Sequence, residues 1–218
     1  MMRTYSILIV TLIAAGCEDS APTIPTGTTT SFFVSSARST TGNLGGLAGA
    51  DATCQRLATA AGHQGTWRAY LSVERDPANG NQPTHARDRI GNGPWYNANR
   101  LLIANNLNDL HSRTGDAELF VDEYGLRING QWTGSPTPNE HDILTGSTAD
   151  GRVMTGSTCA DWTSSAASAT GQVGHSDGMG PQQNTTPPLS SWNSAHSNLN
   201  CSDTAPRGGA GRFYCFAR

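Results

Sequence analysis

The chain has 218 residues and a formal net charge of −3, and all of its 14 basic residues are arginine. Without lysine, mechanisms that need a lysine amine are excluded, among them Schiff-base chemistry and the phosphate-binding lysine of a P-loop. The small negative charge argues against a broad nucleic-acid-binding face, and we expect no nucleic-acid partner. The odd count of five cysteines is more informative, because it predicts a separate role for one of them.

The first 16 residues are typical of an export signal. Arg3 precedes an apolar run, residues 7–15, which is too short to span a bilayer but suits the hydrophobic segment of a signal peptide. Small residues then lead into Cys17, and this ending resembles a bacterial lipobox. We therefore expect residues 1–16 to be removed and Cys17 to be lipidated, with an ordinary secretory signal as the alternative.

The residues after Cys17 predict where the protein is anchored and how far from the membrane. Glu18 stands where an aspartate would favour the inner membrane, so we prefer the outer membrane, on the cell surface or the periplasmic face. Residues 17–31 lack hydrophobic periodicity and are rich in proline and threonine, which predicts a solvated tether. A single domain is expected over residues 32–218.

The domain begins with a strand candidate at residues 32–35, followed by a glycine-rich loop at residues 42–49. A helix is expected over residues 50–61, because Cys54 and Leu57 belong to one apolar face.

Alternating apolar residues predict a strand over residues 66–73. The later elements are expected to be short, namely a strand at 100–103, a helical turn at 105–111, and strands at 119–122 and 213–216. Most of the tryptophans are expected to fill the core rather than to form a binding surface, namely Trp67, Trp95, Trp132, Trp162 and Trp192. The fold class is therefore α+β, with one or two helices, short strands and long loops.

Four cysteines remain for the domain, namely Cys54, Cys159, Cys201 and Cys215. Export permits disulfides, and four cysteines can pair in three ways. The nested arrangement, Cys54 with Cys215 and Cys159 with Cys201, is the economical one. No two of them lie two to four residues apart, so a structural zinc site built from cysteines is not expected.

The sequence contains no recognisable catalytic constellation, and we expect a protein that is not an enzyme. Serines occur without a Gly-x-Ser-x-Gly elbow, which leaves an exported hydrolase as a distant alternative. Glu140-His141-Asp142 could bind a metal, but neighbouring residues point in different directions, so no metal site is expected. The default interpretation for the six histidines is solvated loop residues, and these are His63, His85, His111, His141, His175 and His196.

Several ordered blocks between residues 32 and 218 carry a family resemblance. They include Gly49-Ala50-Asp51 before Cys54, the stretch 158–165 around Cys159, and the ending Phe213-Tyr214-Cys215-Phe216. The first block and the region around Cys159 resemble endostatin, the C-terminal domain of certain collagens. The stretch 158–165 and the ending are closer still to the bacterial endostatin-like lipoproteins, whose leptospiral members are surface lipoproteins.

The resemblance implies a C-type lectin-like fold with paired first and last strands and nested disulfides. It also implies a domain that binds host matrix proteins, such as laminin and fibronectin, or complement regulators. Two features of endostatin are not carried over. Residues 28–33 hold no histidine for its zinc site, and residues 42–49 hold no arginine for its heparin site.

Lectins of this fold bind sugars through a calcium ion held by carboxylate and amide oxygens. Trp192-Asn193 before Cys201 lacks the aspartate of the lectin motif, and Asn139-Glu140 carries suitable residue types in the wrong order. Calcium-assisted carbohydrate binding at these four residues is therefore the alternative to a protein ligand. The competing interpretation makes Trp192 a core or rim aromatic residue and Asn193 a turn residue.

Overall fold

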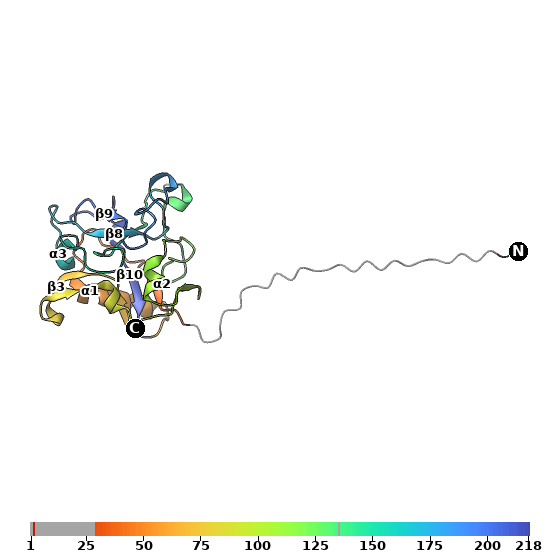
Figure 1. The fold of residues 1–218 in the computed structure, drawn as a ribbon, viewed down its shortest axis with the longest axis horizontal. Coiled ribbons are helices and arrows are strands. Elements are labelled where there is room, and N and C mark those ends of the chain that lie inside the picture. Colours follow the sequence, from red (N-terminus) through yellow and green to blue (C-terminus); the bar gives the residue numbers. More distant parts are fainter. Residues whose placement is uncertain (1, 3–28, 135) are drawn as a thin grey trace.

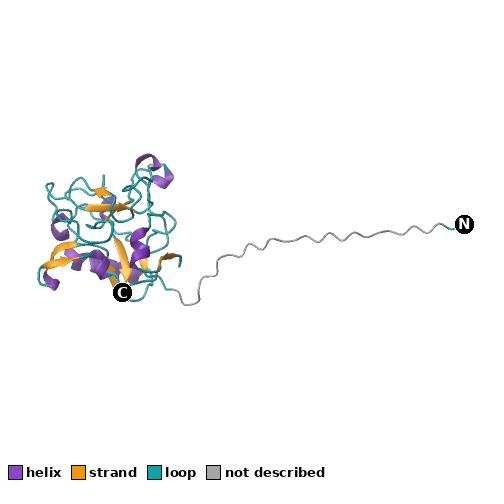
Figure 2. Cartoon of the chain, viewed as in Figure 1, coloured by secondary structure: helices purple, strands orange, loops and turns teal. Residues whose placement is uncertain are grey.

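Residues 29–134 and 136–218, together with Met2, are the part of the chain that this computed structural model describes (Figure 1). Cys17 and nearly all of the expected signal and tether lie outside these residues. Within the described part, no helix combines the length and the apolar character needed to cross a membrane. Its short helices and small antiparallel sheets, joined by loops (Figure 2), confirm the predicted α+β class.

The first and last strands of the domain pair with each other. They belong to an antiparallel sheet with the order β1 (Phe32–Val34), β10 (Tyr214–Ala217) and β2 (Trp67–Ala69). Phe33 lies opposite Cys215, and every residue of β1 is buried. This pairing confirms both predicted end strands and the arrangement that the endostatin resemblance implies.

The helix α1 (Gly46–Ala60) begins four residues before its predicted start. Gly45 caps it in a left-handed conformation (φ 76°), and the Gly49 N–H donates to Gly45 O (3.1 Å) in the first turn. A Cβ on Gly49 would lie 2.3 Å from Leu44 O, so no larger residue fits. The loop predicted at residues 42–49 is therefore wrong in its second half, because glycines hide the helical periodicity there.

A buried carboxylate fastens the inner face of α1 to β2. Asp51 accepts hydrogen bonds from Arg68 Nη1 (2.8 Å), from Arg89 Nη2 (2.8 Å) and from the Ala69 N–H (2.9 Å). The apolar face agrees with the prediction and buries Ala50, Cys54, Leu57 and Ala58.

The strand predicted over residues 66–73 is divided in two. After β2, the Ser72 N–H donates to Thr145 O (2.9 Å), so the chain has left the terminal sheet. It continues as β3 (Val73–Asp76), which pairs with β4 (Gln82–Thr84). Apolar residues continue at every second position where the chain passes from one sheet to the other, and Trp67, Ala69, Leu71 and Val73 are all buried. For this reason the sequence pattern predicts a single strand.

The segment 119–122, predicted to be a strand, forms a turn followed by isolated bridges. The Phe120 N–H donates to Asp116 O (2.8 Å), which closes the turn. The Asp122 side chain then accepts a hydrogen bond from the Leu126 N–H (2.9 Å). These local hydrogen bonds replace the ladder that a strand would need.

The other predicted elements are present with shifted ends. The strand predicted at 100–103 corresponds to β6 (Leu102–Ala104), which pairs with β5 (Trp95–Tyr96), and the predicted turn at 105–111 to α2 (Leu107–Ser112). Further helical turns connect the strands, and these are η1 (Pro77–Asn79), η2 (Ala86–Arg89), η3 (Gln131–Thr133), α3 (Cys159–Trp162), η4 (Pro181–Gln183) and η5 (Gly209–Gly211).

The other three-stranded antiparallel sheet, here called the second sheet, lies at the end of the domain away from the C-terminus (Figure 1). Its strands are β7 (Asp142–Leu144), β8 (Gln172–His175) and β9 (His196–Ser197) in that order. Its register places Asp142 opposite His175, and Val173 opposite His196. Residues far apart in the sequence therefore meet at this sheet.

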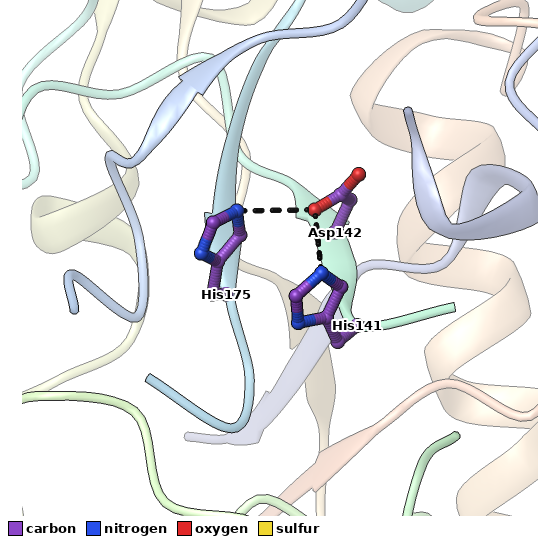
Figure 3. A group of neighbouring side chains, drawn as sticks. All are labelled: His141, Asp142 and His175. Atoms are coloured by element: carbon purple, nitrogen blue, oxygen red, sulfur yellow. Dashed lines mark ion pairs between the residues drawn. The ribbon is translucent and has the colours of Figure 1, made fainter. Parts of the chain in front are cut away.

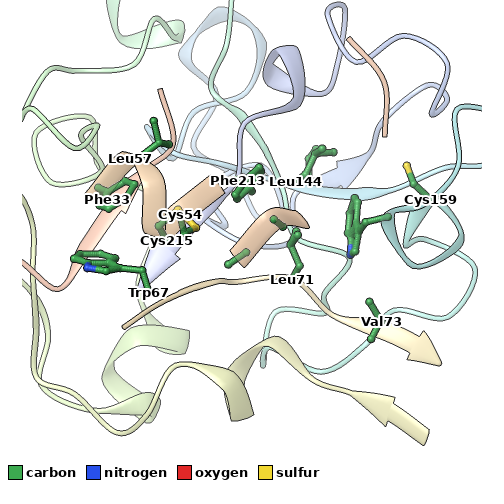
Figure 4. Close-up of a cluster of buried hydrophobic side chains, with 14 of the residues drawn as sticks. Phe33, Cys54, Leu57, Trp67, Leu71, Val73, Leu144, Cys159, Phe213 and Cys215 are labelled. Atoms are coloured by element: carbon green, nitrogen blue, oxygen red, sulfur yellow. A yellow bond between two sulfur atoms is a disulfide. The ribbon is translucent and has the colours of Figure 1, made fainter. Parts of the chain in front are cut away.

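Two buried clusters form the core. One packs α1 against the terminal sheet (Figure 4) and includes Phe33, Leu57, Trp67 and Phe213. The other is largely aromatic and includes Phe32, Tyr70, Phe120, Trp192, Tyr214 and Phe216. As expected, most of the tryptophans are buried, whereas Trp132 is partly exposed.

Both disulfides follow the nested arrangement. Cys54–Cys215 joins α1 to β10, and Cys159–Cys201 joins the start of α3 to the loop after β9. All four cysteines are fully buried. The covalent frame thus ties the first helix to the last strand and encloses a smaller loop within it.

Candidate functional site

Three histidine rings and one carboxylate converge at the second sheet, and we call this group the histidine–aspartate cluster (His141, Asp142, His175 and His196). Asp142 begins β7, His175 ends β8 and His196 begins β9. Figure 3 shows His141 and His175 directed at the Asp142 carboxylate. The Nε2 atoms of His175, His141 and His196 lie 3.2, 3.3 and 3.5 Å from Asp142 Oδ1.

The cluster corrects two expectations for these histidines. The side chains of His141 and His175 are only 6% and 1% exposed, so they are not solvated loop residues. His141 and Asp142 also face the same point, although neighbouring strand residues alternate between faces. His141 lies just before β7, so its side chain is not held to the alternation of that strand.

Every imidazole of the cluster has an oxygen next to its Nδ1 atom. That oxygen is Asp177 Oδ1 for His141 (2.7 Å), Leu189 O for His175 (2.7 Å) and Ser197 O for His196 (2.9 Å). Because these oxygens can only accept, each Nδ1 donates. In the neutral rings, the bare nitrogen is then Nε2, which faces the Asp142 carboxylate.

The charges in the cluster reinforce one another. Burial alone would raise the pKa of Asp142, but the positive charge that His175, His196 and His141 carry when they are protonated outweighs it and holds this pKa well below its usual range. Burial alone would lower the pKa of His196, but the Asp142 carboxylate outweighs it and raises this pKa above its usual value. Asp142 is thus an ionised carboxylate inside the cluster, and it favours the positive charge of the neighbouring His196.

A pocket of about 450 Å³ connects the cluster to the surface. Its lining includes Asn139, Leu189 and Arg207 besides the four cluster residues. The His196 side chain is 20% exposed, so the cluster is reached from its side. Imidazole nitrogens and carboxylate oxygens at such a position can bind a cation or exchange protons with a ligand.

The residues predicted to bind a ligand near Cys201 belong to the core. Trp192 is fully buried, and its Nε1 donates to Leu110 O (2.9 Å). The Asn193 Nδ2 donates to Tyr70 Oη (3.0 Å), and its Oδ1 accepts from Ser191 Oγ (3.1 Å). The core and turn interpretation of Trp192-Asn193 is therefore correct, because these polar atoms are used inside the protein.

Asn139 and Glu140 do not join Asn193. Glu140 is buried, and its carboxylate accepts from Arg212 Nη2 (2.6 Å) and pairs with Arg38 Nε (2.7 Å). Asn139 lines the pocket beside the histidine–aspartate cluster, where its Oδ1 accepts a hydrogen bond from the His141 N–H (3.3 Å). The four residues proposed for calcium thus have separate structural partners.

Asn193 belongs to a buried hydrogen-bond chain that ends on His111. The Tyr70 Oη–H donates to His111 Nε2 (2.8 Å), and His111 Nδ1–H donates to Leu107 O (2.7 Å). Burial lowers the pKa of His111 below its usual value of 6.5. Protonating His111 would remove the acceptor that Tyr70 needs.

This chain predicts a loss of stability in mild acid. The unfolded chain protonates His111 at its ordinary pKa, before the folded protein does, so stability falls as the pH drops through 6.5 toward the lowered folded pKa. In urea unfolding, we expect the wild-type midpoint to decrease more steeply with falling pH than that of His111→Gln. Parallel pH profiles for the two proteins would contradict this role of His111.

The histidine–aspartate cluster gives only a weak signal in the sequence. The Glu140-His141-Asp142 triplet points to it, and so does Asp177, which stands two residues after His175. Neither pattern indicates that the two segments are partners. That information resides in the pairing of β7 with β8.

The fold and the cluster define a disulfide-bonded α+β domain with a buried histidine–aspartate site. Residues 37–179 match the family described as protein of unknown function DUF1554, and the chain belongs to this family. The matched region contains His141, Asp142 and His175, and it ends before His196. No curated protein matches the chain.

Proposed function

We propose that this chain is an exported, lipid-anchored and non-catalytic binding protein of the bacterial cell envelope. The observation that carries the proposal is the pair of buried disulfides, which engage all four cysteines of the domain. Disulfides persist in oxidising compartments and are rare in the cytosol. They leave Cys17, in its lipobox-like context, as the remaining cysteine.

The proposed domain is a C-type lectin-like fold of the endostatin-like lipoproteins. The paired first and last strands, the nested disulfides and the loop-rich segment between them support this assignment. A protein ligand follows from the resemblance, with matrix proteins as the first candidates. The pocket over the histidine–aspartate cluster is the proposed contact point, because it combines polar groups with a surface opening.

Calcium-assisted carbohydrate binding receives less support than a protein ligand. The side-chain oxygen of Asn193 and both oxygens of Glu140 are already hydrogen-bonded or ion-paired. Calcium would need six to eight oxygen ligands at one point. Moving the Glu140 carboxylate to a calcium ion would leave the buried Arg212 without its counter-ion.

Labelling of the expressed chain with palmitate tests the anchor. We expect the wild type to incorporate the label and to remain with the membrane fraction, and Cys17→Ala to lose both properties, because only a cysteine thiol accepts the lipid. Cys159→Ala is the matched control, since it also removes one cysteine but leaves the lipobox intact. Equal labelling of wild type and Cys17→Ala would refute the anchor.

The binding role is tested with the full chain on a panel of matrix proteins and on a glycan array. The proposal expects saturable binding to a protein, weakened by Arg207→Glu at the pocket and unchanged by Arg152→Glu elsewhere on the surface. Blank panels would overturn the proposed matrix-binding role. Glycan binding that requires calcium would favour the alternative.

A further inference from the structure

We propose that the histidine–aspartate cluster is a binding site for a divalent metal ion of the zinc type, held by Nε2 of three histidines and Oδ1 of Asp142. The histidines are His141, His175 and His196. The proposal does not depend on the lipid anchor or on a protein ligand, so its failure would leave both untouched.

The distances in the cluster fit a tetrahedral metal site. Zinc binds imidazole nitrogen and carboxylate oxygen at about 2.0–2.2 Å, so two ligand atoms of one tetrahedron lie about 3.3–3.5 Å apart. The three Nε2 atoms lie 3.2, 3.3 and 3.5 Å from Asp142 Oδ1. The ligand atoms of His141, Asp142 and His175 also lie within 4.8 Å of one another.

Two buried atoms at the centre of the cluster lack a hydrogen-bond partner among the described residues. They are Asp142 Oδ1 and His175 Nε2. With the Nδ1 atoms donating outward, neutral rings would turn their Nε2 lone pairs toward a carboxylate that also carries lone pairs. An unsatisfied buried polar atom is costly, and a cation between these atoms would satisfy all of them.

The surroundings of the rings have the arrangement usual for metal-binding histidines. Such histidines almost always donate their second ring N–H to a carboxylate or a backbone carbonyl, which fixes the ring and its tautomer. His141 donates to the Asp177 carboxylate, and His175 and His196 donate to the backbone carbonyls of Leu189 and Ser197. Asp177 is itself held by the Met179 N–H (3.1 Å).

The charge balance also favours a doubly charged ion. Asp142 and Asp177 are both buried, at 8% and 3% exposed. The neighbouring Glu140 is neutralised separately by Arg212 and Arg38. A divalent ion would therefore neutralise the two remaining carboxylates. The stacked rings of His141 and His175, whose centroids are 4.5 Å apart, could then stay neutral.

Nitrogen ligands decide the class of metal. Three imidazoles and one carboxylate suit zinc and its neighbours among the transition metals, whereas calcium and magnesium prefer all-oxygen sites. The sheet register fixes Asp142 opposite His175, so these ligands are positioned before binding. The pocket beside His196 provides a path for the ion.

Isothermal titration tests the site. The full chain, without a histidine tag and freed of metal with EDTA, is titrated with zinc chloride and separately with calcium chloride. We expect one zinc ion per chain, no calcium uptake, and the intense visible absorption of tetrahedral cobalt when cobalt replaces zinc. Asp142→Asn and His175→Gln should weaken zinc binding by more than about 100-fold, and Asp177→Asn by about 10–100-fold.

His85→Gln is the matched control, because His85 lies outside the cluster, where its Nδ1 accepts from the Val153 N–H (3.0 Å). It should bind zinc as the wild type does. Circular dichroism checks each variant, and the more exposed His196→Gln replaces any variant that fails to fold. The proposal is overturned if the wild type takes up no zinc, if Asp142→Asn binds zinc as tightly as the wild type, or if only calcium binds.

Discussion

Replacing both Cys54 and Cys215 with alanine is expected to lower the free energy of unfolding by about 3–5 kcal/mol. This disulfide joins residues separated by 161 positions, so its loss frees almost the whole domain in the unfolded state. The loop-entropy estimate for that separation is about 5 kcal/mol, an upper value. Because domains are stable by only about 5–15 kcal/mol, the change is a large share of the total.

Urea unfolding followed by tryptophan fluorescence measures this effect. The control is the double variant Cys159→Ala/Cys201→Ala, which opens a loop with a separation of 42 and should cost less, about 2–4 kcal/mol. Both pairs are fully buried, so the cavities left by alanine are comparable. A smaller loss for the outer pair than for the inner pair would contradict the argument from loop length.

Glu140→Ala is expected to destabilise the protein by about 3–5 kcal/mol, because it leaves the buried Arg212 without its counter-ion. The Arg212 side chain is 8% exposed, and its Nε and Nη2 both donate to Glu140 Oε2. Its Nη1 donates to Ser35 O (2.7 Å), so the guanidinium cannot leave without breaking a contact to the end of β1.

Arg38→Ala removes only the exposed ion pair of Glu140 and keeps its buried pair with Arg212, so it serves as the control. Arg38 pairs with the same carboxylate, but its side chain is 59% exposed, so its removal should cost only about 0–1 kcal/mol. Thermal or urea unfolding of the two variants gives the comparison. Equal losses for Glu140→Ala and Arg38→Ala would show that burial of Arg212 does not set the cost.

The parts of the fold that the sequence predicts are those governed by local pattern and by cysteine pairing. The apolar face of α1 follows from helical spacing at Cys54 and Leu57, and the end strands follow from short apolar runs. The ends of helices and strands are harder to predict, because glycines mask the helical pattern in the first turn of α1. Likewise, apolar residues alternate from Trp67 to Val73 although the backbone leaves β10 and hydrogen-bonds to Thr145 within this stretch.

The candidate site depends on contacts that a local pattern does not contain. Asp142 and His175 are adjacent only because β7 and β8 pair in one register. His196 joins them through β9, and in the sequence each histidine resembles a polar loop residue. For Asn193, the lectin-like position in the sequence suggested a ligand, whereas in the structure its side-chain amide donates to Tyr70 Oη inside the core.

The pairing of β1 with β10 has a practical consequence for how the protein is handled. The Ala217 N–H donates to Ser31 O (2.9 Å), so the start and the end of the domain emerge side by side. The second sheet lies at the opposite pole, away from the C-terminus (Figure 1). A biotin attached to Arg218 would therefore orient the domain on a sensor chip with the histidine–aspartate cluster facing the flowing sample.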